Sequence, residues 1–251
     1  MTHVPKYLYK YFPINKHLFE LLTLKHIYFS LVEEFNDPLE CGIVPEFDLI
    51  DPEAVKNYVD LNLRPYQQYK KHVMRIDKEG FENVVRDEYR RAFEFMKGEV
   101  RVLCLSAVGN SPVMFSHYAD KHRGVCLKFN SSLIPFHQNL QYVNYPKTYP
   151  TIPLLGVTDF KEDYNRKVRL HYYTKAESWK YEKEWRVAIR KDGDGKHDFP
   201  PEMISGIIFG LKTADTKRVR IMKLMRSMNW GGRFQQVTGM KKDFTLDICD
   251  I

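Results

Sequence analysis

Ser111-Pro-Val-Met-Phe-Ser-His-Tyr-Ala-Asp-Lys-His-Arg-Gly-Val-Cys126 is the stretch of this 251-residue chain that indicates the fold most clearly. Pro112 suits the first turn of a helix, because its φ angle is already helical and it has no N–H to leave unpaired. Ser111 suits the N-cap, and Gly124 suits the turn that follows the helix. We therefore predict a helix over residues 112–121.

Hydrophobic spacing elsewhere in the chain indicates both strands and helices. Strands are predicted at residues 8–12, 27–30, 100–106, 125–129, 142–145, 185–190, 204–209, 234–237 and 244–249. Further helices are predicted at residues 15–24, with Asn15 as the N-cap, at 159–174 and at 214–228. Asn36-Asp-Pro38 is a turn by its chemistry. The sum is an α+β fold, in which helices surround a mixed, mostly antiparallel sheet, with a split sheet left open.

The chain is long enough to bury one large core, and we predict a single α+β domain over residues 1–251. Residues 52–97 are charged, lack strand alternation and show helical spacing at Val55 and Val59 and again at Val84 and Val85. We predict that they form a helical insertion or cap within that domain.

Composition favours a globular protein with an acidic or phosphate-bearing partner. The formal net charge is +7 and the pI is about 9.0. No apolar run approaches the ~20 residues that span a bilayer, so we expect a cytoplasmic protein without a membrane partner. The four cysteines are far apart and form no C-x-x-C pair, so we expect reduced, mostly core thiols and no metal site. Composition predicts no oligomeric state.

The central stretch crowds Ser116, His117, Tyr118, Asp120 and His122 into seven residues. Two other segments, residues 28–38 and 179–186, also mix aromatic and polar side chains, and we interpret the three as walls of one cleft. For His117 two readings stay open. It is either a buried histidine tied to a backbone carbonyl, or else His117 or Tyr118 is a ligand donor at the mouth of the site.

Tyr181-Glu-Lys-Glu-Trp-Arg186 leads into a predicted strand, where alternation would put Glu182, Glu184 and Arg186 on one face. Arg186 could simply pair with Glu184 or with Asp37. Alternatively, a glutamate held by such neighbours is well suited to stabilise a cationic transition state or to accept a proton.

Five ordered motifs resemble those of a widespread bacterial and phage domain family of unknown function. They are Tyr9-Lys-Tyr-Phe12, Tyr28-Phe-Ser30 with Phe35-Asn-Asp-Pro38, Leu103-Cys-Leu-Ser106, Met114-Phe-Ser-His-Tyr-Ala-Asp120 with His122-Arg-Gly-Val-Cys126, and Trp179-Lys-Tyr-Glu-Lys-Glu-Trp-Arg186. The motifs cover roughly residues 7–210, and Phe115 stands where that family usually has Trp. The family label implies no activity.

The order of elements is also similar to that of ADP-ribosyltransferases. Those enzymes bind NAD in a split-sheet cleft, anchor it with a His or Arg on the first strand, stack nicotinamide on a Tyr and use a late Glu. The resemblance implies Lys10 or Tyr11 as the anchor, although neither is His or Arg. It also implies Tyr28 as the stacking residue, Ser30 as a hydroxyl contact and Glu184, or less favourably Glu182, as the catalytic residue.

The catalytic candidates are thus Glu184, Glu182 and His117. The candidates for binding NAD are Lys10, Tyr11, Tyr28, Ser30, Asn36, Asp37, Ser116, Tyr118, Arg123 and Arg186. Arg186, Arg123 or Lys10 would hold the diphosphate of NAD, and the acceptor of ADP-ribose would be a protein, a nucleic acid or water. Such proteins often act as toxins or phage-defence effectors.

Two alternatives belong to other classes. In a metal-independent nuclease or nucleic-acid binder, His117 and His122 would do acid–base work and the basic helix near residues 217–226 would contact phosphates. The third reading is a ligand-sensing or interaction module without turnover.

Overall fold

The computed structural model describes residues 3–37, 40–41, 98–148, 150 and 168–251, which divide between two compact units. The first unit comprises the described residues up to 30, from 101 to 143 and from 178 onward. The second comprises the described residues within 31–100 and 144–177. The predicted insertion at residues 52–97 lies outside the described residues.

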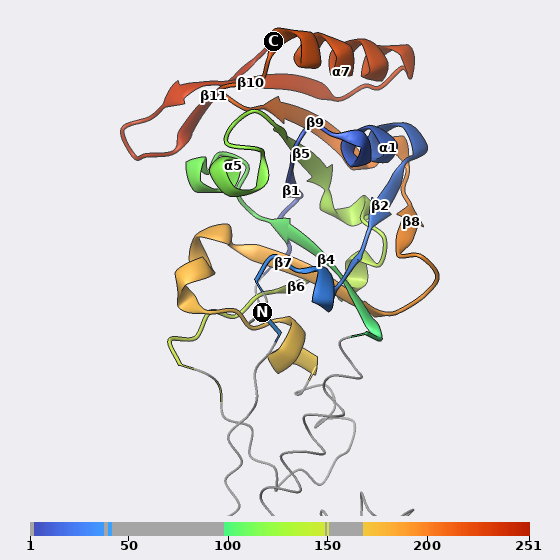
Figure 1. The fold of residues 1–251 in the computed structure, drawn as a ribbon, viewed down its shortest axis with the longest axis vertical. Helices are drawn as coiled ribbons and strands as arrows, with labels where there is room; N and C mark the ends of the chain where they lie inside the picture. The colour runs from blue at the N-terminus through green and yellow to red at the C-terminus, as the bar shows by residue number, and fades with distance from the viewer. Residues whose placement is uncertain (1–2, 38–39, 42–97, 149, 151–167) are drawn as a thin grey trace, which may run out of the picture. The chain divides into compact units, whose positions relative to one another are not determined.

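One large sheet dominates the described chain (Figure 1). Its strands follow the order β11 (Leu246–Asp250), β10 (Arg233–Met240), β9 (Ile204–Phe209), β5 (Val125–Asn130), β1 (Tyr7–Phe12), β4 (Val100–Ser106), β7 (Glu184–Arg190) and β6 (Gln141–Tyr142). β9 and β10 are parallel, whereas the pairs β10–β11, β9–β5, β5–β1, β1–β4 and β7–β6 are antiparallel. The predicted α+β class with a mostly antiparallel sheet is confirmed.

The sheet narrows sharply between β1 and β4. β1 pairs with β5 along its full length, from Tyr7 opposite Asn130 to Phe12 opposite Val125. With β4 it shares the single pair Tyr9 and Ser106. In Figure 1 the strands β4, β7 and β6 accordingly diverge from the group formed by β1, β5 and β9.

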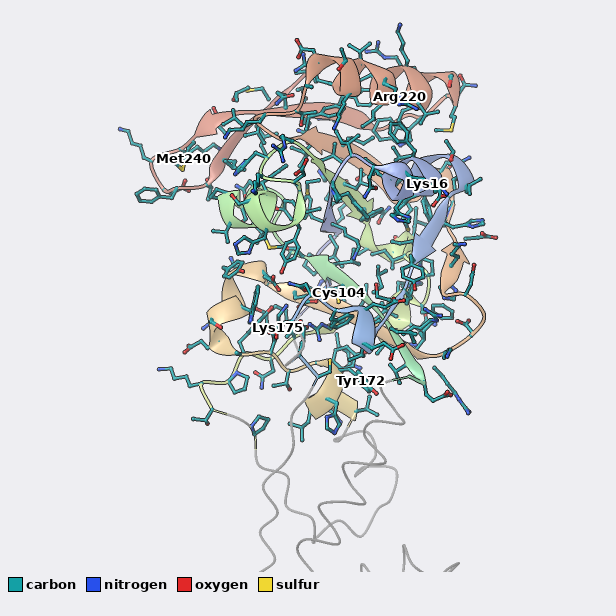
Figure 2. All side chains as sticks on the ribbon, viewed as in Figure 1. Lys16, Cys104, Tyr172, Lys175, Arg220 and Met240 are labelled. Carbon is teal, nitrogen blue, oxygen red and sulfur yellow. The ribbon has the colours of Figure 1, made fainter. Side chains whose placement is uncertain are left out.

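Two helices cover one face of the sheet. α1 (Lys16–Leu24) begins where the Asn15 side chain accepts a hydrogen bond from the Leu18 N–H, as predicted. α7 (Asp215–Ser227) connects β9 to the parallel strand β10 and buries Ile221 and Met225. These side chains join the larger core, which includes Leu8, Leu127, Phe129 and Ile207 from alternate positions of the strands. Figure 2 shows the side chains on both helices, with Lys16 and Arg220 labelled.

A third helix, α5 (Pro112–Tyr118), packs on the opposite face of the sheet. Met114 and Phe115 form a smaller core there with Tyr11, Cys126 and Ile208. The Ser111 side chain caps the helix by accepting from the Met114 N–H, as predicted. The helix ends at Tyr118 rather than at residue 121, because the backbone of residues 120–122 turns into the left-handed region.

Some predicted elements differ from the structure. The strand predicted at residues 27–30 is interrupted at Phe29, whose N–H donates to the Gly195 carbonyl. β2 (His26–Tyr28) pairs with β8 (Lys196–Asp198) in a separate small sheet, whereas β3 (Ser30–Leu31) pairs with β4 in the large sheet. β6 is shorter than the strand predicted at 142–145, and of the helix predicted at 159–174 the described part is helical at 168–172. The short 3₁₀ helices are η1 (Val32–Glu34), η3 (Ser131–Leu133), η4 (His137–Asn139), η5 (Glu177–Glu182) and η6 (Pro201–Met203).

The second unit contains a buried ion pair of its own. Lys175 Nζ lies 3.3 Å from Glu40 Oε2, and both side chains are almost fully enclosed. In the same unit the Glu40 N–H donates to the Asp37 carbonyl. The turn predicted at residues 36–38 includes Pro38, which lies outside the described residues.

Within the described residues no helix is both long enough and apolar enough to cross a membrane. None of the four cysteines forms a disulfide. Cys41 and Cys126 are buried, Cys104 is partly buried and Cys249 is exposed.

Candidate functional site

The end of α5 runs into an unusual left-handed turn. Asp120, Lys121 and His122 have φ angles of 48°, 54° and 68°, a region that non-glycine residues seldom occupy. Arg123 clasps this turn through two hydrogen bonds to the Asp120 carboxylate, of 2.6 and 3.1 Å. That contact lowers the pKa of Asp120. Arg123, a predicted diphosphate ligand, thus has a local role in holding the turn.

His122 packs back onto α5. Its ring stacks on Phe115 with the centroids 5.6 Å apart, and its Nε2 lies 3.1 Å from Ser116 Oγ. Burial, with a smaller contribution from the Lys212 cation, lowers the pKa of His122 below its ordinary 6.5. Ser116, a candidate ligand residue, is therefore a partner of His122.

The lowered pKa of His122 makes stability depend on pH in a defined direction. The unfolded chain binds this proton more readily than the folded one, so the contribution is fully present above pH 6.5 and is lost as pH falls through the folded pKa. We expect His122→Gln to lose less free energy of unfolding than the wild type between about pH 7 and about pH 5. Urea titrations across this range, with His137→Gln at an exposed position as control, would measure it. Parallel pH profiles for all three proteins would contradict the expectation.

α5 presents two side chains to the segment just before β7. The Tyr118 hydroxyl donates to Glu182 Oε1 at 2.6 Å, and the Tyr181 hydroxyl lies 3.4 Å from His117 Nδ1. Glu182 is buried, Tyr118 and Tyr181 are partly buried, and His117 is exposed. The reading of His117 as a buried structural histidine is therefore wrong. We call these four residues the Tyr118–Glu182 cluster.

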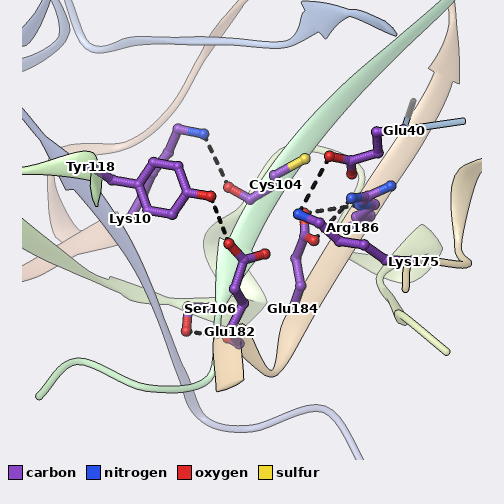
Figure 3. A network of polar contacts seen from close by, with 9 residues as sticks. All are labelled: Lys10, Glu40, Cys104, Ser106, Tyr118, Lys175, Glu182, Glu184 and Arg186. Atoms are coloured by element: carbon purple, nitrogen blue, oxygen red, sulfur yellow. Dashed lines mark hydrogen bonds and ion pairs between the residues drawn. The ribbon is translucent and has the colours of Figure 1, made fainter. Parts of the chain in front are cut away.

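The backbone beneath the cluster is fixed to the end of β4. Ser106 Oγ donates to the Glu182 carbonyl at 2.6 Å (Figure 3). It also accepts from the Val108 N–H at 2.9 Å. The Ala107 N–H donates to the carbonyl of Lys183, whose φ of 43° is left-handed. Because Ser106 also makes the single pair between β1 and β4, the cluster lies beside the narrow junction of the sheet.

Glu184 and Arg186 form a separate buried pair. Arg186 Nε and Nη2 donate to the two carboxylate oxygens of Glu184, each at 2.9 Å. Their side chains are 6% and 0% exposed, respectively. Of the two partners considered for Arg186, Glu184 is confirmed. The prediction that Glu182 shares their strand face is wrong, because β7 begins only at Glu184 and the left-handed Lys183 breaks the alternation.

The candidates on β1 reach across the junction in two ways. Lys10 Nζ donates to the Cys104 carbonyl on β4 at 3.0 Å (Figure 3). The Tyr11 hydroxyl donates to the Val108 carbonyl at 2.7 Å, and its ring meets Phe115 edge to face. Burial raises the pKa of Tyr11 well above its ordinary value. Lys10 therefore lies at the junction, whereas Tyr11 is part of the core beneath α5.

The first predicted segment is divided. Tyr28, in the small sheet, accepts a hydrogen bond from Arg101 Nη1 at 3.3 Å, and the guanidinium lies 5.7 Å from its ring centroid. Ser30 is partly buried in β3. Asn36 and Asp37 belong to the second unit. Of the three predicted walls, the central stretch and the segment before β7 contact each other, through the Tyr118–Glu182 and His117–Tyr181 contacts.

α7 is the basic helix that would contact phosphates in a nuclease, and several of its basic side chains make contacts within the protein. Arg218 bonds to Asp215 and Gln236, while Arg220 and Arg226 lie over the rings of Phe19 and Phe234. These contacts join α7 to its neighbours.

Ser106 and Tyr181 were not predicted as site residues, although they lie within the motifs at residues 103–106 and 179–186. Nothing in the sequence marks the Ser106 hydroxyl as the anchor of a carbonyl 76 residues away. In the part of the chain that the structure describes, no group of three or more His, Cys, Asp and Glu side chains could hold a metal ion.

Comparison with known proteins gives one match. No curated protein and no solved structure matches this chain. Residues 114–187 match the model of a family described as protein of unknown function, DUF2971. They run from α5 to β7 and include the whole Tyr118–Glu182 cluster. The predicted resemblance to a domain family of unknown function is confirmed.

Proposed function

We propose that the Tyr118–Glu182 cluster is the catalytic centre of an ADP-ribosyltransferase-like enzyme that splits the glycosidic bond of NAD. The observation that carries the proposal is the position of the Glu182 carboxylate. It is buried, receives the Tyr118 hydroxyl at 2.6 Å, and is anchored through Ser106 beside the one pair that joins β1 to β4. The resemblance to ADP-ribosyltransferases implies a late glutamate in a split-sheet cleft, and Glu182 is the second of the two glutamates that it suggests.

In this proposal the bond between C1′ of the ribose and the nicotinamide nitrogen breaks heterolytically. Nicotinamide leaves as a neutral base with the bonding electrons, and positive charge develops on the ribose. The Glu182 carboxylate stabilises that charge in a largely desolvated setting, where such an interaction is strong. Water or another nucleophile then adds to C1′ and loses its proton to solvent.

The Tyr118 hydroxyl indicates how the sugar would be held. A neutral O–H donates to Glu182 Oε1 in the protein alone, and a ribose hydroxyl offers the same donor. We assign the substrate hydroxyl to that place, with Tyr118 moving aside. Lys10, which donates to a carbonyl across the junction, is the cation assigned to the diphosphate.

This proposal gives Glu184 a different role from the one first expected. Its carboxylate is neutralised by the bidentate Arg186, so we assign the pair to fixing the start of β7 and the chemistry to Glu182. Consumption of NAD in the cytoplasm suits a toxin or phage-defence effector, which we include in the proposal.

The test is release of nicotinamide from NAD labelled on the adenylate, with nucleic acid or cell lysate as acceptor. We expect Glu182→Gln, which keeps an oxygen for Tyr118 but removes the charge, to lower the rate by about a hundredfold. Glu202→Gln, at an exposed glutamate, serves as the control and should leave the rate unchanged. The position of the label would identify the acceptor.

Two results would count against this reading. Undiminished release by folded Glu182→Gln would remove Glu182 from the chemistry. No release by the wild type with any acceptor would reject NAD cleavage, and would favour nucleic-acid cleavage or ligand binding without turnover.

A further inference from the structure

A row of residues crosses four strands on the face of the sheet that also carries α5. Tyr9 on β1 lies opposite Lys128 on β5, Lys128 opposite Gly206 on β9, and Gly206 opposite Arg233 on β10. Side chains in such a row point to the same face. Gly206 has none, so the row contains a gap between two cations.

The gap is part of a hollow of about 260 Å³. Its lining is polar and consists of Tyr7, Lys128, Ser205, Gly206, Arg233 and Gln235. Tyr11 and Cys126 lie further along the same strands on this face, under α5. The helix therefore covers one end of the face, and the hollow lies toward the other.

The polar groups around the hollow favour an anion. Lys128 Nζ lies 4.0 Å from the centroid of the Tyr7 ring, which holds the ammonium group by a cation–π contact. The Arg233 side chain is 79% exposed, and its Nη1 lies 3.8 Å from Asp250 Oδ2, too far for a hydrogen bond. Asp250 also accepts from Gln235 at 2.9 Å, so it is a competing negative charge at one rim.

We infer that this hollow is a binding site for a phosphate group. The guanidinium of Arg233 offers paired donors and Lys128 a point charge, the two side chains that recognise phosphate most often. The volume is slightly below that of pockets for drug-sized ligands, so it suits phosphate or the phosphate end of a small ester. The site is separate from the Tyr118–Glu182 cluster, and its test does not depend on the proposed function.

The inference is tested by calorimetric titration of the full chain with inorganic phosphate and with ribose 5-phosphate at low salt. Arg233→Gln should weaken binding at least about tenfold. Gly206→Val, which fills the gap without changing any charge, should do the same. Lys223→Gln makes the same charge change on α7, which covers the opposite face of the sheet. This variant should bind phosphate as the wild type does.

Further variants keep the test decisive. Gly206→Ala is a milder filling, because its Cβ would lie 3.5 Å from Lys128 Cβ in ordinary contact. Asp250→Asn should tighten binding by removing the competing charge. Equal affinity for the two ligands would support a site for phosphate alone, and tighter binding of the ester a site for a phosphorylated small molecule. Absence of binding to the wild type, or equal losses in Lys223→Gln and Arg233→Gln, would overturn the inference.

Discussion

Replacement of Gly124 by alanine is expected to lower the free energy of unfolding by about 3 kcal/mol or to prevent folding. A Cβ at this position would lie 2.1 Å from the Phe12 carbonyl oxygen and 2.9 Å from the backbone of Ala119. Both neighbours are main-chain atoms, one in β1 and one after α5. Relief would require β1 or the left-handed turn to move.

The effect should be large because Gly124 also joins three elements. Its N–H donates to the Ala119 carbonyl, and its own carbonyl accepts from the Gly210 N–H and the Thr213 hydroxyl. The measurement is urea unfolding followed by tryptophan fluorescence. Gly206→Ala on β9, the strand that pairs with β5, is the matched control. It should change the free energy of unfolding by less than about 1 kcal/mol. Equal stability of the two variants would show that the backbone near Gly124 can yield.

Replacement of Arg186 by methionine should cost about 3–5 kcal/mol of stability. The change keeps much of the side-chain volume but removes the guanidinium that neutralises Glu184. With the carboxylate 6% exposed, water is poorly placed to replace that partner.

A double-mutant cycle separates the loss of the pair from the loss of one partner. Glu184→Leu combined with Arg186→Met removes both charges, so it should be more stable than Arg186→Met alone. Chemical unfolding of the wild type, the two single variants and the double variant gives the coupling energy. A double variant no more stable than Arg186→Met would show that charge burial is not what makes the single change costly.

Local chemistry made much of the fold predictable. Asn15 and Ser111 cap their helices as their side chains dictate, because each can accept a nearby backbone N–H. The strands at 100–106 and 204–209 match their apolar runs. These features depend on residues close together in sequence, and the sequence therefore specifies them well.

The site was predictable in composition but less so in geometry. The density of polar groups in the central stretch predicted that they contact one another, yet Asp120, Arg123, Ser116 and His122 mostly hold the turn together. Strand alternation failed at Glu182 because one left-handed residue, Lys183, precedes β7. A backbone conformation of that kind is imposed by contacts distant in sequence, such as the one between Ala107 and Lys183, and no spacing rule contains it.

The pairing of β1 with β5 also sets how long β1 must wait for its partner during synthesis. The Tyr7 partner, Asn130, is made 123 residues later (130 − 7), and at translation rates of roughly 5–20 residues per second this delay lasts roughly 6–25 s. Throughout that interval β1 and the apolar face of α1 have been synthesised without β5, and the core that they share also takes later residues such as Ile207 and Ile221. By contrast, β9, α7, β10 and β11 follow one another within residues 204–250 and can assemble as soon as they leave the ribosome. β2 waits longer still, because its partner β8 lies at residues 196–198. The N-terminal strands β1 and β2 are thus segments that need protection by chaperones during synthesis.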